Sequence, residues 1–337
     1  MKILRNRAYA RAGFLGNPSD GYHGKTISFI AQNFSAEVVL YEWDTVEIVL
    51  AEQDRARFRS VNDLANDVKL HGYYGGIRLV KATIKRFVEY CHERDIELHN
   101  QNFSIRYSSD IPRQVGLAGS SSIIVATLRC LMEFYDVQIP VPAQPTFVLT
   151  VEQEELGISA GLQDRVIQVF EGLVYMDFDK SNERLINSFK TYKYERLKPE
   201  QLPHIYVAYH DGLSEPTEVY HNDIRGRFLR GEKIVVDAMN RFAEIADEGR
   251  HALITKNFDL LSTLIDENFD LRQSISQLPE WQVRMIQEAR DCGASAKFAG
   301  SGGAIVGTFK NDKMFEKLTE NMASMGVKTI LPQIKSP

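Results

Sequence analysis

The feature that most constrains the fold is a loop of small residues that runs directly into an amphipathic helix, within Pro112–Phe134. Gly116, Ala118 and Gly119 allow a backbone to approach an anion closely. Three serines follow at 120–122, where their hydroxyls suit a helix N-cap and the positive dipole end of the helix would face the same anion. Apolar positions then recur at helical spacing, at Ile123, Ile124, Thr127, Leu128, Leu131 and Phe134. The stretch predicts a helix that opens on a phosphate-binding loop.

This stretch alone leaves a second interpretation open. The chain contains neither G-x-x-x-x-G-K-S/T nor a G-x-G-x-x-G that follows a strand, the two common phosphate-loop patterns. A Ser/Gly loop that only caps a core helix explains the same residues equally well.

Length and composition indicate an ordinary globular protein with a small partner. A chain of 337 residues exceeds what one compact core usually organises, so we expect two lobes and a cleft between them. The hydrophobic fraction is 44%, the charged fraction 25% and the formal net charge −5. There is no basic excess of the kind that binds nucleic acid or an anionic membrane.

Cysteine usage and the N-terminal sequence predict a cytoplasmic location. Cys91, Cys130 and Cys292 are far apart, odd in number and without C-x-x-C spacing, which fits a reducing compartment. Lys2 and Arg5 begin a basic N-terminal stretch that lacks the apolar core of a signal peptide. No later run is long and apolar enough for a membrane span.

The first half of the chain predicts strands followed by helices. β-rich runs separated by turn residues predict mostly antiparallel strands at Arg7–Leu15, Thr26–Phe34, Ala36–Tyr41, Val46–Ala51, Phe103–Tyr107 and Leu173–Asp177. Helical periodicity predicts helices at Val61–Leu70, Gly76–Arg94 and Pro145–Leu156. Between the first two helices, a loop with two adjacent tyrosines at 71–76 fits either a packed turn or a ligand-stacking role.

Acidic residues cluster where the last of these helices ends. Glu152, Glu154 and Glu155 oppose the helix dipole there, and after a small-residue break at 157–161 comes Asp164-Arg165. One of the glutamates is expected to have a function, although a solvated charged face is the more common explanation of such a run. A surface ion pair is the alternative for Asp164.

A polar, pattern-poor segment at 180–201 marks the expected lobe boundary, with one domain at 1–195 and a second at 196–337. The second domain is predicted to contain strands at His204–Tyr209 and Lys328–Leu331 and helices at Glu218–Leu229, Lys233–Ile254, Asp259–Gln277, Gln282–Cys292 and Met314–Met325. A glycine cluster at 300–303 joins two further short strands, and a hairpin turn or a ligand loop would explain it.

Three small-residue loops in this order resemble the motifs of the GHMP kinases. Their second motif, P-x-x-x-G-L-G-S-S-S/A, is matched by Pro112, Gly116, Leu117, Ser120 and Ser121. Their third, a Lys-x-S/T-G-A/S-G-G run, is matched by Lys297, Gly300, Ser301, Gly302 and Gly303. Their first is matched more loosely by Arg11, Gly16 and Asp20. The resemblance implies a two-lobed α+β fold, with a ribosomal S5 domain 2-like first lobe and a ferredoxin-like second lobe.

The same resemblance implies an ATP- and Mg²⁺-dependent kinase and assigns roles to single residues. ATP phosphates would lie on Pro112, Gly116, Leu117, Ala118, Gly119, Ser120, Ser121 and Ser122. Ser120 and Glu152 match the family's magnesium ligands, and hard oxygens suit that ion. Asp164 matches the catalytic aspartate, and Arg11 would assist catalysis by stabilising the transferring group. Substrate binding is expected from Arg11, Asn17, Asp20, Arg113 and Gly302.

Four further segments resemble a family member whose acceptor is D-glucuronate, so we expect phosphorylation of that sugar at its anomeric hydroxyl. Asn17-Pro18-Ser19 replaces the Glu-His of galactose-type first motifs, which speaks against galactose. A uronic acid also needs a cation, and Arg113, Arg165, Lys25 and Arg78 all remain open. The alternatives are a kinase for galacturonate, a heptose phosphate or a galactose-like sugar, and a kinase-like sensor without catalysis. A homodimer is compatible with all of these.

The second motif departs from the family pattern at one point. Ala118-Gly119 stands where Gly-Ser is usual. The residues alone offer no account of this exchange.

Overall fold

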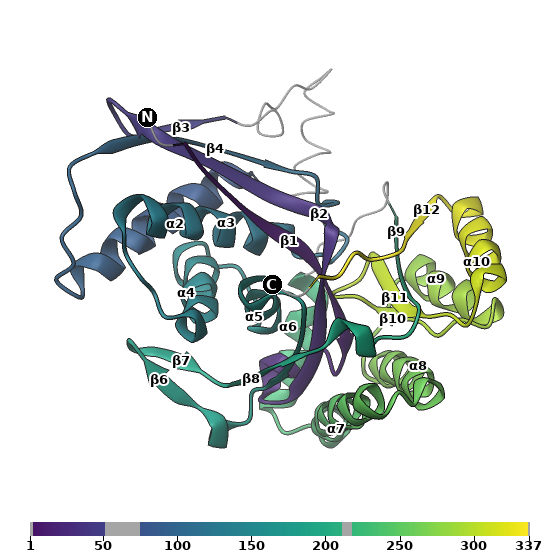
Figure 1. Cartoon of the computed structure of the whole chain (residues 1–337). Coiled ribbons are helices and arrows are strands. Elements are labelled where there is room, and N and C mark those ends of the chain that lie inside the picture. The colour runs from purple at the N-terminus through teal and green to yellow at the C-terminus, as the bar shows by residue number, and fades with distance from the viewer. Residues whose placement is uncertain (1–2, 51–74, 211–217, 336–337) are drawn as a thin grey trace, which may run out of the picture.

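The computed structural model describes residues 3–50, 75–210 and 218–335. It has two lobes of mixed α and β structure, one to each side of the long strands β1 (Ile3–Leu15) and β2 (Lys25–Trp43) in Figure 1. The α+β fold expected from the sequence is therefore confirmed. The helix expected at 61–70 and most of the tyrosine loop lie outside the described residues.

The first lobe is built on a six-stranded, mostly antiparallel sheet. Its order is β3-β4-β2-β5-β8, with β1 also paired to β2. The remaining strands are β3 (Glu47–Val49), β4 (Asn102–Ser109), β5 (Leu173–Asp177) and β8 (Lys193–Leu197). The pair formed by β3 and β4 is parallel.

Strand β2 corrects one expectation, since two strands were predicted where the structure has a single long one. Its pairing with β1 is interrupted instead: Tyr9 pairs with Ser35, whereas Ala10 pairs with Ala31. This bulge lets one strand bend and serve two parts of the sheet. The break expected between the strands at 26–34 and 36–41 is therefore a register shift within one strand.

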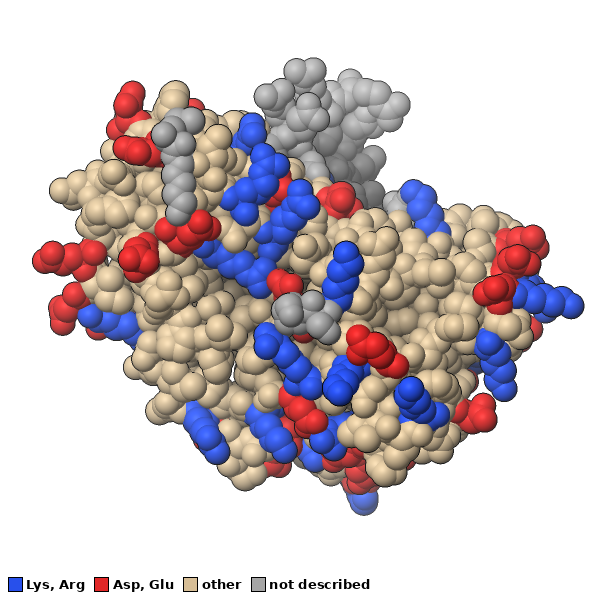
Figure 2. Space-filling view, in the orientation of Figure 1, with Lys and Arg blue, Asp and Glu red and all other residues tan. Residues whose placement is uncertain are grey.

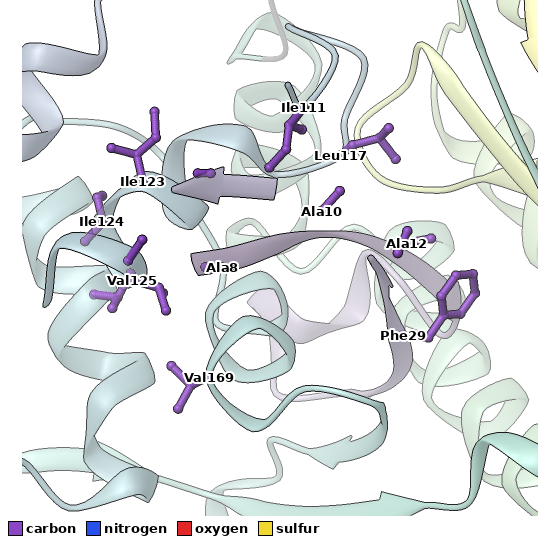
Figure 3. Close-up of a cluster of buried hydrophobic side chains, with 14 of the residues drawn as sticks. Ala8, Ala10, Ala12, Phe29, Ile111, Leu117, Ile123, Ile124, Val125 and Val169 are labelled. Atoms are coloured by element: carbon purple, nitrogen blue, oxygen red, sulfur yellow. The ribbon is translucent and has the colours of Figure 1, made fainter. Parts of the chain in front are cut away.

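Helices cover one face of this sheet close to β1. They are α2 (Gly76–His92), α3 (Gly119–Tyr135), α4 (Gln144–Thr150) and α5 (Gln163–Phe170). Figure 3 shows Ala8, Ala10 and Ala12 along β1, near side chains of the loop before α3 and of α3 itself. Alternate residues of a strand share one face, so these small side chains allow the helices to pack tightly on β1. The site loops are thereby fixed to a rigid base.

Two further local expectations for the first lobe need correction. The helix expected at 145–156 is α4 followed by a π-helical turn, Val151–Glu155. The segment at 180–201, expected to lack pattern, forms the hairpin β6 (Arg184–Ile186) and β7 (Phe189–Thr191) and then strand β8. Strands of three residues are too short to show a period in sequence.

The second lobe is a four-stranded antiparallel sheet with helices. Its order is β10-β11-β9-β12, and the glycine cluster is the hairpin between β10 and β11. The strands are β9 (Ile205–His210), β10 (Lys297–Phe298), β11 (Ala304–Thr308) and β12 (Val327–Ile330). The helices are α6 (Glu218–Leu229), α7 (Lys233–Thr255), α8 (Phe258–Ile275), α9 (Glu280–Asp291) and α10 (Asp312–Ser324).

Helix α7 joins the lobes by packing on the first sheet. Val174 and Met176 of β5 share an apolar cluster with α5, whereas Tyr175 between them donates a hydrogen bond to Asp247 of α7 at 2.5 Å. Because successive residues of a strand face opposite sides, α5 and α7 cover opposite faces of β5. Lys25 of β2 also pairs with Asp247, at 2.5 Å.

Within the described ranges, no helix is both long and apolar enough to cross a membrane.

Candidate active site

Arg11 lies where the three predicted motif loops meet. It is 5% exposed and comes from the middle of β1. Its Nη1 donates to the carbonyls of Gly116 and, at 3.1 Å, Ala299, and its backbone N–H donates to Leu117 at 3.2 Å. One guanidinium thus binds the backbone of both glycine-containing loops. The sequence alone did not indicate this linking role.

Asp164 forms a bidentate ion pair with the same arginine. Nε of Arg11 lies 2.6 Å from Oδ1 of Asp164, and Nη2 lies 2.8 Å from Oδ2. The carboxylate stands in the first turn of α5 and is 20% exposed, with a second, longer ion pair to Arg165 at 3.4 Å. The geometry favours the charged carboxylate and fixes its orientation. The alternative interpretation of Asp164, as one partner of a solvated surface ion pair, therefore does not describe this arrangement.

Glu152 and Arg165 form a buried ion pair next to this site. Glu152 is 1% exposed, its Oε2 accepts from Nε of Arg165 at 2.5 Å, and Nη2 of the arginine contacts the same oxygen. Burial raises the pKa of the Glu152 carboxyl, and the arginine opposes that shift. Both contacts from Arg165 fall on Oε2, so Oε1 lies outside this ion pair. That second oxygen and the Ser120 hydroxyl are hard donors of the kind that Mg²⁺ prefers.

The described residues hold no group of three or more acidic, histidine or cysteine side chains placed to bind a metal. An ion at Ser120 and Glu152 would therefore take most of its ligands from water and phosphate, as Mg²⁺ usually does at nucleotide sites. The donor set fits the ion expected from the sequence.

The loop before α3 differs from expectation at its helix cap. The helix begins at Gly119, and its N-cap is Ala118 in the left-handed conformation, with φ 62° and no side-chain cap. The serines serve other contacts: the hydroxyls of Ser121 and Ser122 donate back to the carbonyl of Ala118, at 3.3 and 2.9 Å. The predicted serine N-cap is therefore wrong, because the turn into the helix is made by backbone conformation.

The left-handed N-cap explains why the family motif carries glycine at this position, and nothing in the structure explains why this chain has alanine there. A glycine adopts positive φ without strain, and Ala118 occupies the position where the motif carries glycine. At Gly119, an added Cβ would lie 3.5 Å from Ile111, which is ordinary contact. A serine would fit at Gly119, so nothing in the packing requires glycine there.

The two glycine loops are in direct contact. A Cβ added at Gly116 would lie 2.7 Å from the carbonyl oxygen of Gly302 and 3.2 Å from the backbone N of Ser301. One added at Gly300 would lie 2.4 Å from the carbonyl oxygen of Gly116. Side chains at these positions would separate the loops, so glycine is required for their approach. The structure thus brings the second and third motifs into contact.

Asp20 faces the catalytic side of this junction. Its Oδ2 accepts from the backbone N–H of Gln163 at 3.3 Å, and it lies close enough to Asp164 for their charges to interact. Burial and then the Asp164 charge raise the pKa of Asp20 to about 6. This places the expected hydroxyl-binding carboxylate beside the expected base.

The other expected substrate-binding residues are placed differently. The side chain of Asn17 is 5% exposed, and its Oδ1 accepts from Nζ of Lys297 at 2.6 Å. Gly302, with φ 144°, packs against Gln282, and Arg113 is exposed on the loop before α3. Of the cations left open for a carboxylate, Lys25 pairs with Asp247 and Arg165 with Glu152.

Comparison with known proteins identifies the family. The family profile described as GHMP kinases N terminal domain matches residues 78–172, and GHMP kinases C terminal matches residues 250–328. Glucuronokinase 1 of Arabidopsis thaliana is 42% identical over 310 residues, covering 90% of this chain and 84% of that protein. The chain belongs to the GHMP kinases. It is therefore a phosphotransferase, and the family uses ATP.

Other relatives of this GHMP kinase act on different acceptors. A D-glycero-alpha-D-manno-heptose 7-phosphate kinase of Campylobacter jejuni is 23% identical over 90% of this chain and 87% of its own. Among solved structures, Lactococcus lactis galactokinase complexed with galactose has a TM-score of 0.79 at 14% identity, covering 99% of this chain and 94% of its own. The galactokinase likeness confirms the two-lobed family fold.

Two buried side chains of this kinase were missed by sequence reasoning. Gln168 donates from Nε2 to the carbonyl of Ala118 at 2.8 Å and to Oγ of Ser122 at 2.7 Å. Arg272 of α8 donates to the carbonyls of Gly300 and Ser301. Gln168 follows Asp164 by four residues, which places both on one side of α5 and is the only sequence signal for its role. Arg272 gives none.

Proposed function

We propose that this GHMP kinase transfers the γ-phosphoryl group of ATP, with Mg²⁺, to the anomeric hydroxyl of D-glucuronate. The observation that carries the proposal is the 42% identity to Glucuronokinase 1 across 84% of that protein. Three free, buried cysteines support the cytoplasmic location that the sequence predicts. Lys and Arg side chains, with several Asp and Glu side chains among them, gather across the middle of the face in Figure 2. Basic side chains near the site would favour two anionic reactants.

The reaction requires a fixed acceptor, a base and neutralisation of phosphate charge. In our proposal, Asp164 accepts the proton of the anomeric hydroxyl as its oxygen forms a bond to the γ-phosphorus, and the bond to the β-phosphate oxygen breaks to release ADP. Arg11 holds both oxygens of Asp164, so the base approaches the hydroxyl in one orientation. Asp20 accepts hydrogen bonds from the sugar hydroxyls beside it.

The loop before α3 would hold the ATP phosphates at Pro112 and Gly116–Ser122. The N-terminus of α3 and the backbone N–H groups of the loop supply positive potential. Ser120 and Glu152 would hold Mg²⁺, which supplies charge neutralisation on the phosphates when it is bound. Arg113, exposed on the same loop, remains a candidate for contact with either reactant.

The test is ADP release with ATP-Mg²⁺ and a panel of acceptors: D-glucuronate, D-galacturonate, D-glucose, D-galactose and a heptose 7-phosphate. We expect turnover with D-glucuronate to exceed every other acceptor. Absence of turnover with D-glucuronate above background would refute the substrate assignment, and turnover with the heptose phosphate alone would favour the activity named for the Campylobacter relative.

Asp164→Asn tests the base. We expect kcat to fall by at least about 100-fold, because general acid–base catalysis contributes on that order. Binding of ATP, measured by fluorescence titration, should change little. A variant that keeps wild-type kcat would show that Asp164 is not the base, and a wild-type protein that binds both reactants without single-turnover transfer would favour a sensor.

A further inference from the structure

Three buried cations surround the hairpin loop at 297–303. Arg11, Lys297 and Arg272 are 5%, 1% and 4% exposed. Arg11 has the carboxylate of Asp164. In the described part of the chain, Nζ of Lys297 donates only to the carbonyls of Gly13 and Phe298 and to Oδ1 of Asn17, at 2.8, 2.7 and 2.6 Å. Within the described ranges Arg272 donates only to backbone carbonyls. Positive charge is unfavourable in this cluster: burial and then the charges of Arg272 and Arg11 lower the pKa of Lys297 well below its ordinary value, as expected where the described carboxylates do not fully balance the arginines.

One N–H donor of the Arg272 guanidinium is buried and unpaired within the described residues. Nη1 donates to the carbonyl of Gly300 and Nη2 to that of Ser301, both at 3.1 Å, while the buried Nε has no hydrogen-bond partner in the described chain. An arginine has five N–H donors, and Nε with the adjacent Nη2 hydrogen forms the edge that a carboxylate binds through both oxygens. A buried donor left unpaired costs free energy, so this edge fits an oxyanion.

Burial also lowers the pKa of Arg272 to about 10, and Tyr22 is the group that opposes this shift. Among the residues that the structure describes, no carboxylate pairs with this side chain.

The position of Arg272 separates it from the phosphate loop. The backbone N of Ser301 and its Oγ face the loop before α3, each 3.2 Å from where a Cβ of Gly116 would lie. The carbonyls of Gly300 and Ser301 face Arg272 instead. Arg272 is close enough to Tyr22 for the phenol to influence the pKa of the arginine, and Tyr22 belongs to the same 3-10 turn as Asp20.

We propose that Arg272 binds the carboxylate of the acceptor sugar and so sets the preference of this kinase for a sugar acid. The inference rests on the proposed function and deepens it, because Asp20 on the neighbouring turn is the carboxylate assigned to the sugar hydroxyls. Of the four cations left open from the sequence, Lys25 and Arg165 already have acidic partners, and Arg113 and Arg78 remain competitors.

The experiment compares Arg272→Gln with wild type, using D-glucuronate and D-glucose, which differ only in the carboxylate and CH₂OH groups at C6. For the variant, kcat/KM with D-glucuronate should fall by at least about 100-fold, as expected when one partner of a buried charge pair is removed. Because Arg272 also holds the carbonyls of Gly300 and Ser301, both sugars share any loss that acts through the loop. The deciding readout is therefore the ratio of kcat/KM for D-glucuronate to that for D-glucose, which should fall by at least about 30-fold. Arg272→Lys keeps the charge but loses the paired donors, so its kcat/KM should be intermediate.

Arg290→Gln is the matched control. Arg290 is also held against α8, by ion pairs with Asp266 and Asp270, and lies outside the proposed site. It should leave the preference for D-glucuronate over D-glucose unchanged. Thermal unfolding of each variant establishes that it is folded before the kinetics are compared.

Two results would overturn the proposal. An Arg272→Gln protein that keeps the wild-type preference would exclude the carboxylate contact. An equal fall with both sugars, together with a raised KM for ATP, would assign the arginine to the nucleotide phosphates or to support of the loop. If wild type does not phosphorylate D-glucuronate, the proposed function fails separately, and calorimetric binding of D-galacturonate to wild type and Arg272→Gln then tests the arginine by itself.

Discussion

Ala118 shows how one residue can be both strained and useful. Its left-handed backbone turns the chain into α3, and its carbonyl accepts hydrogen bonds from Ser121, Ser122 and Gln168. Several contacts thus hold a conformation that alanine adopts only at a cost of about 1–2 kcal/mol. Strain of this kind persists where surrounding structure determines the backbone, often at ligand sites.

Ala118→Gly should therefore stabilise the protein by about 0.5–1 kcal/mol. Relief of the left-handed strain exceeds the extra entropy that glycine gives the unfolded chain. Urea unfolding would measure the difference. Ala126→Gly, the same exchange inside α3, is the control and should destabilise by at least about 1 kcal/mol. Equal losses in both variants would contradict positive φ at position 118.

Asp20 is expected to make sugar binding depend on pH. Its pKa of about 6 lies above the ordinary value of 3.8, because of burial and then the charge of Asp164. The fold thus favours the protonated form: the stability contributed by Asp20 is complete below about pH 4 and is lost as the pH rises through about 6. The charged acceptor needed for sugar hydroxyls is present only above about pH 6.

The KM for the sugar should accordingly rise as the pH falls below 6, by about tenfold at pH 5, since one pH unit changes the charged fraction tenfold. The KM for ATP over the same range is the internal control. Asp20→Asn should bind the sugar more weakly at pH 8 but lose the pH dependence. An unchanged pH profile in that variant would assign the titration to another group.

At the scale of elements, α5 connects the proposed base to the phosphate loop. Asp164 lies in its first turn, and Gln168 one turn later holds Ala118 and Ser122. A displacement of this helix would therefore move both parts of the site together.

Gln168→Met should raise the KM for ATP about fivefold, which corresponds to the loss of about 1 kcal/mol from one hydrogen-bonding side chain. Its control is Gln144→Met, because Gln144 is also buried and donates to a backbone carbonyl, that of Ile139, at 2.9 Å. Both variants should lose similar stability in urea, but only the first should change the KM. A raised KM in both would mean that the effect is general destabilisation.

Elements with a clear period were predictable from the sequence, and irregular ones were not. The strand at Leu173–Asp177 has the predicted bounds, and α2 was predicted to within two residues. The π-helical turn around Glu152 and the hairpin at 184–191 were missed, because their conformation depends on tertiary contacts. The site followed the same rule: the motifs located Asp164 and the loops, whereas Arg272 has no local pattern to reveal it.

At the scale of the molecule, the two lobes share one core. The apolar cluster around β1 includes Phe14 and Phe29 of the first lobe together with Ile245, Leu264 and Val306 of the second. Tyr175 and Lys25 add polar contacts to α7 across the same boundary. The division at residues 195 and 196, still a prediction, would therefore separate two lobes that do not bury their apolar faces independently.

The lobes should accordingly unfold in one cooperative transition. The chain has two tryptophans, Trp43 at the end of β2 and Trp281 in α9, so each lobe carries its own fluorescence probe. In Trp281→Phe and Trp43→Phe variants the remaining tryptophan reports the first and second lobe, respectively, and circular dichroism reports helix content in both. Because exposing α7 would leave apolar surface on both sides, we expect the fluorescence and dichroism midpoints in urea to coincide within each variant. Midpoints that differ between the two probes of one variant would show that the lobes are thermodynamic domains, and the shared core would then contribute less than its burial implies.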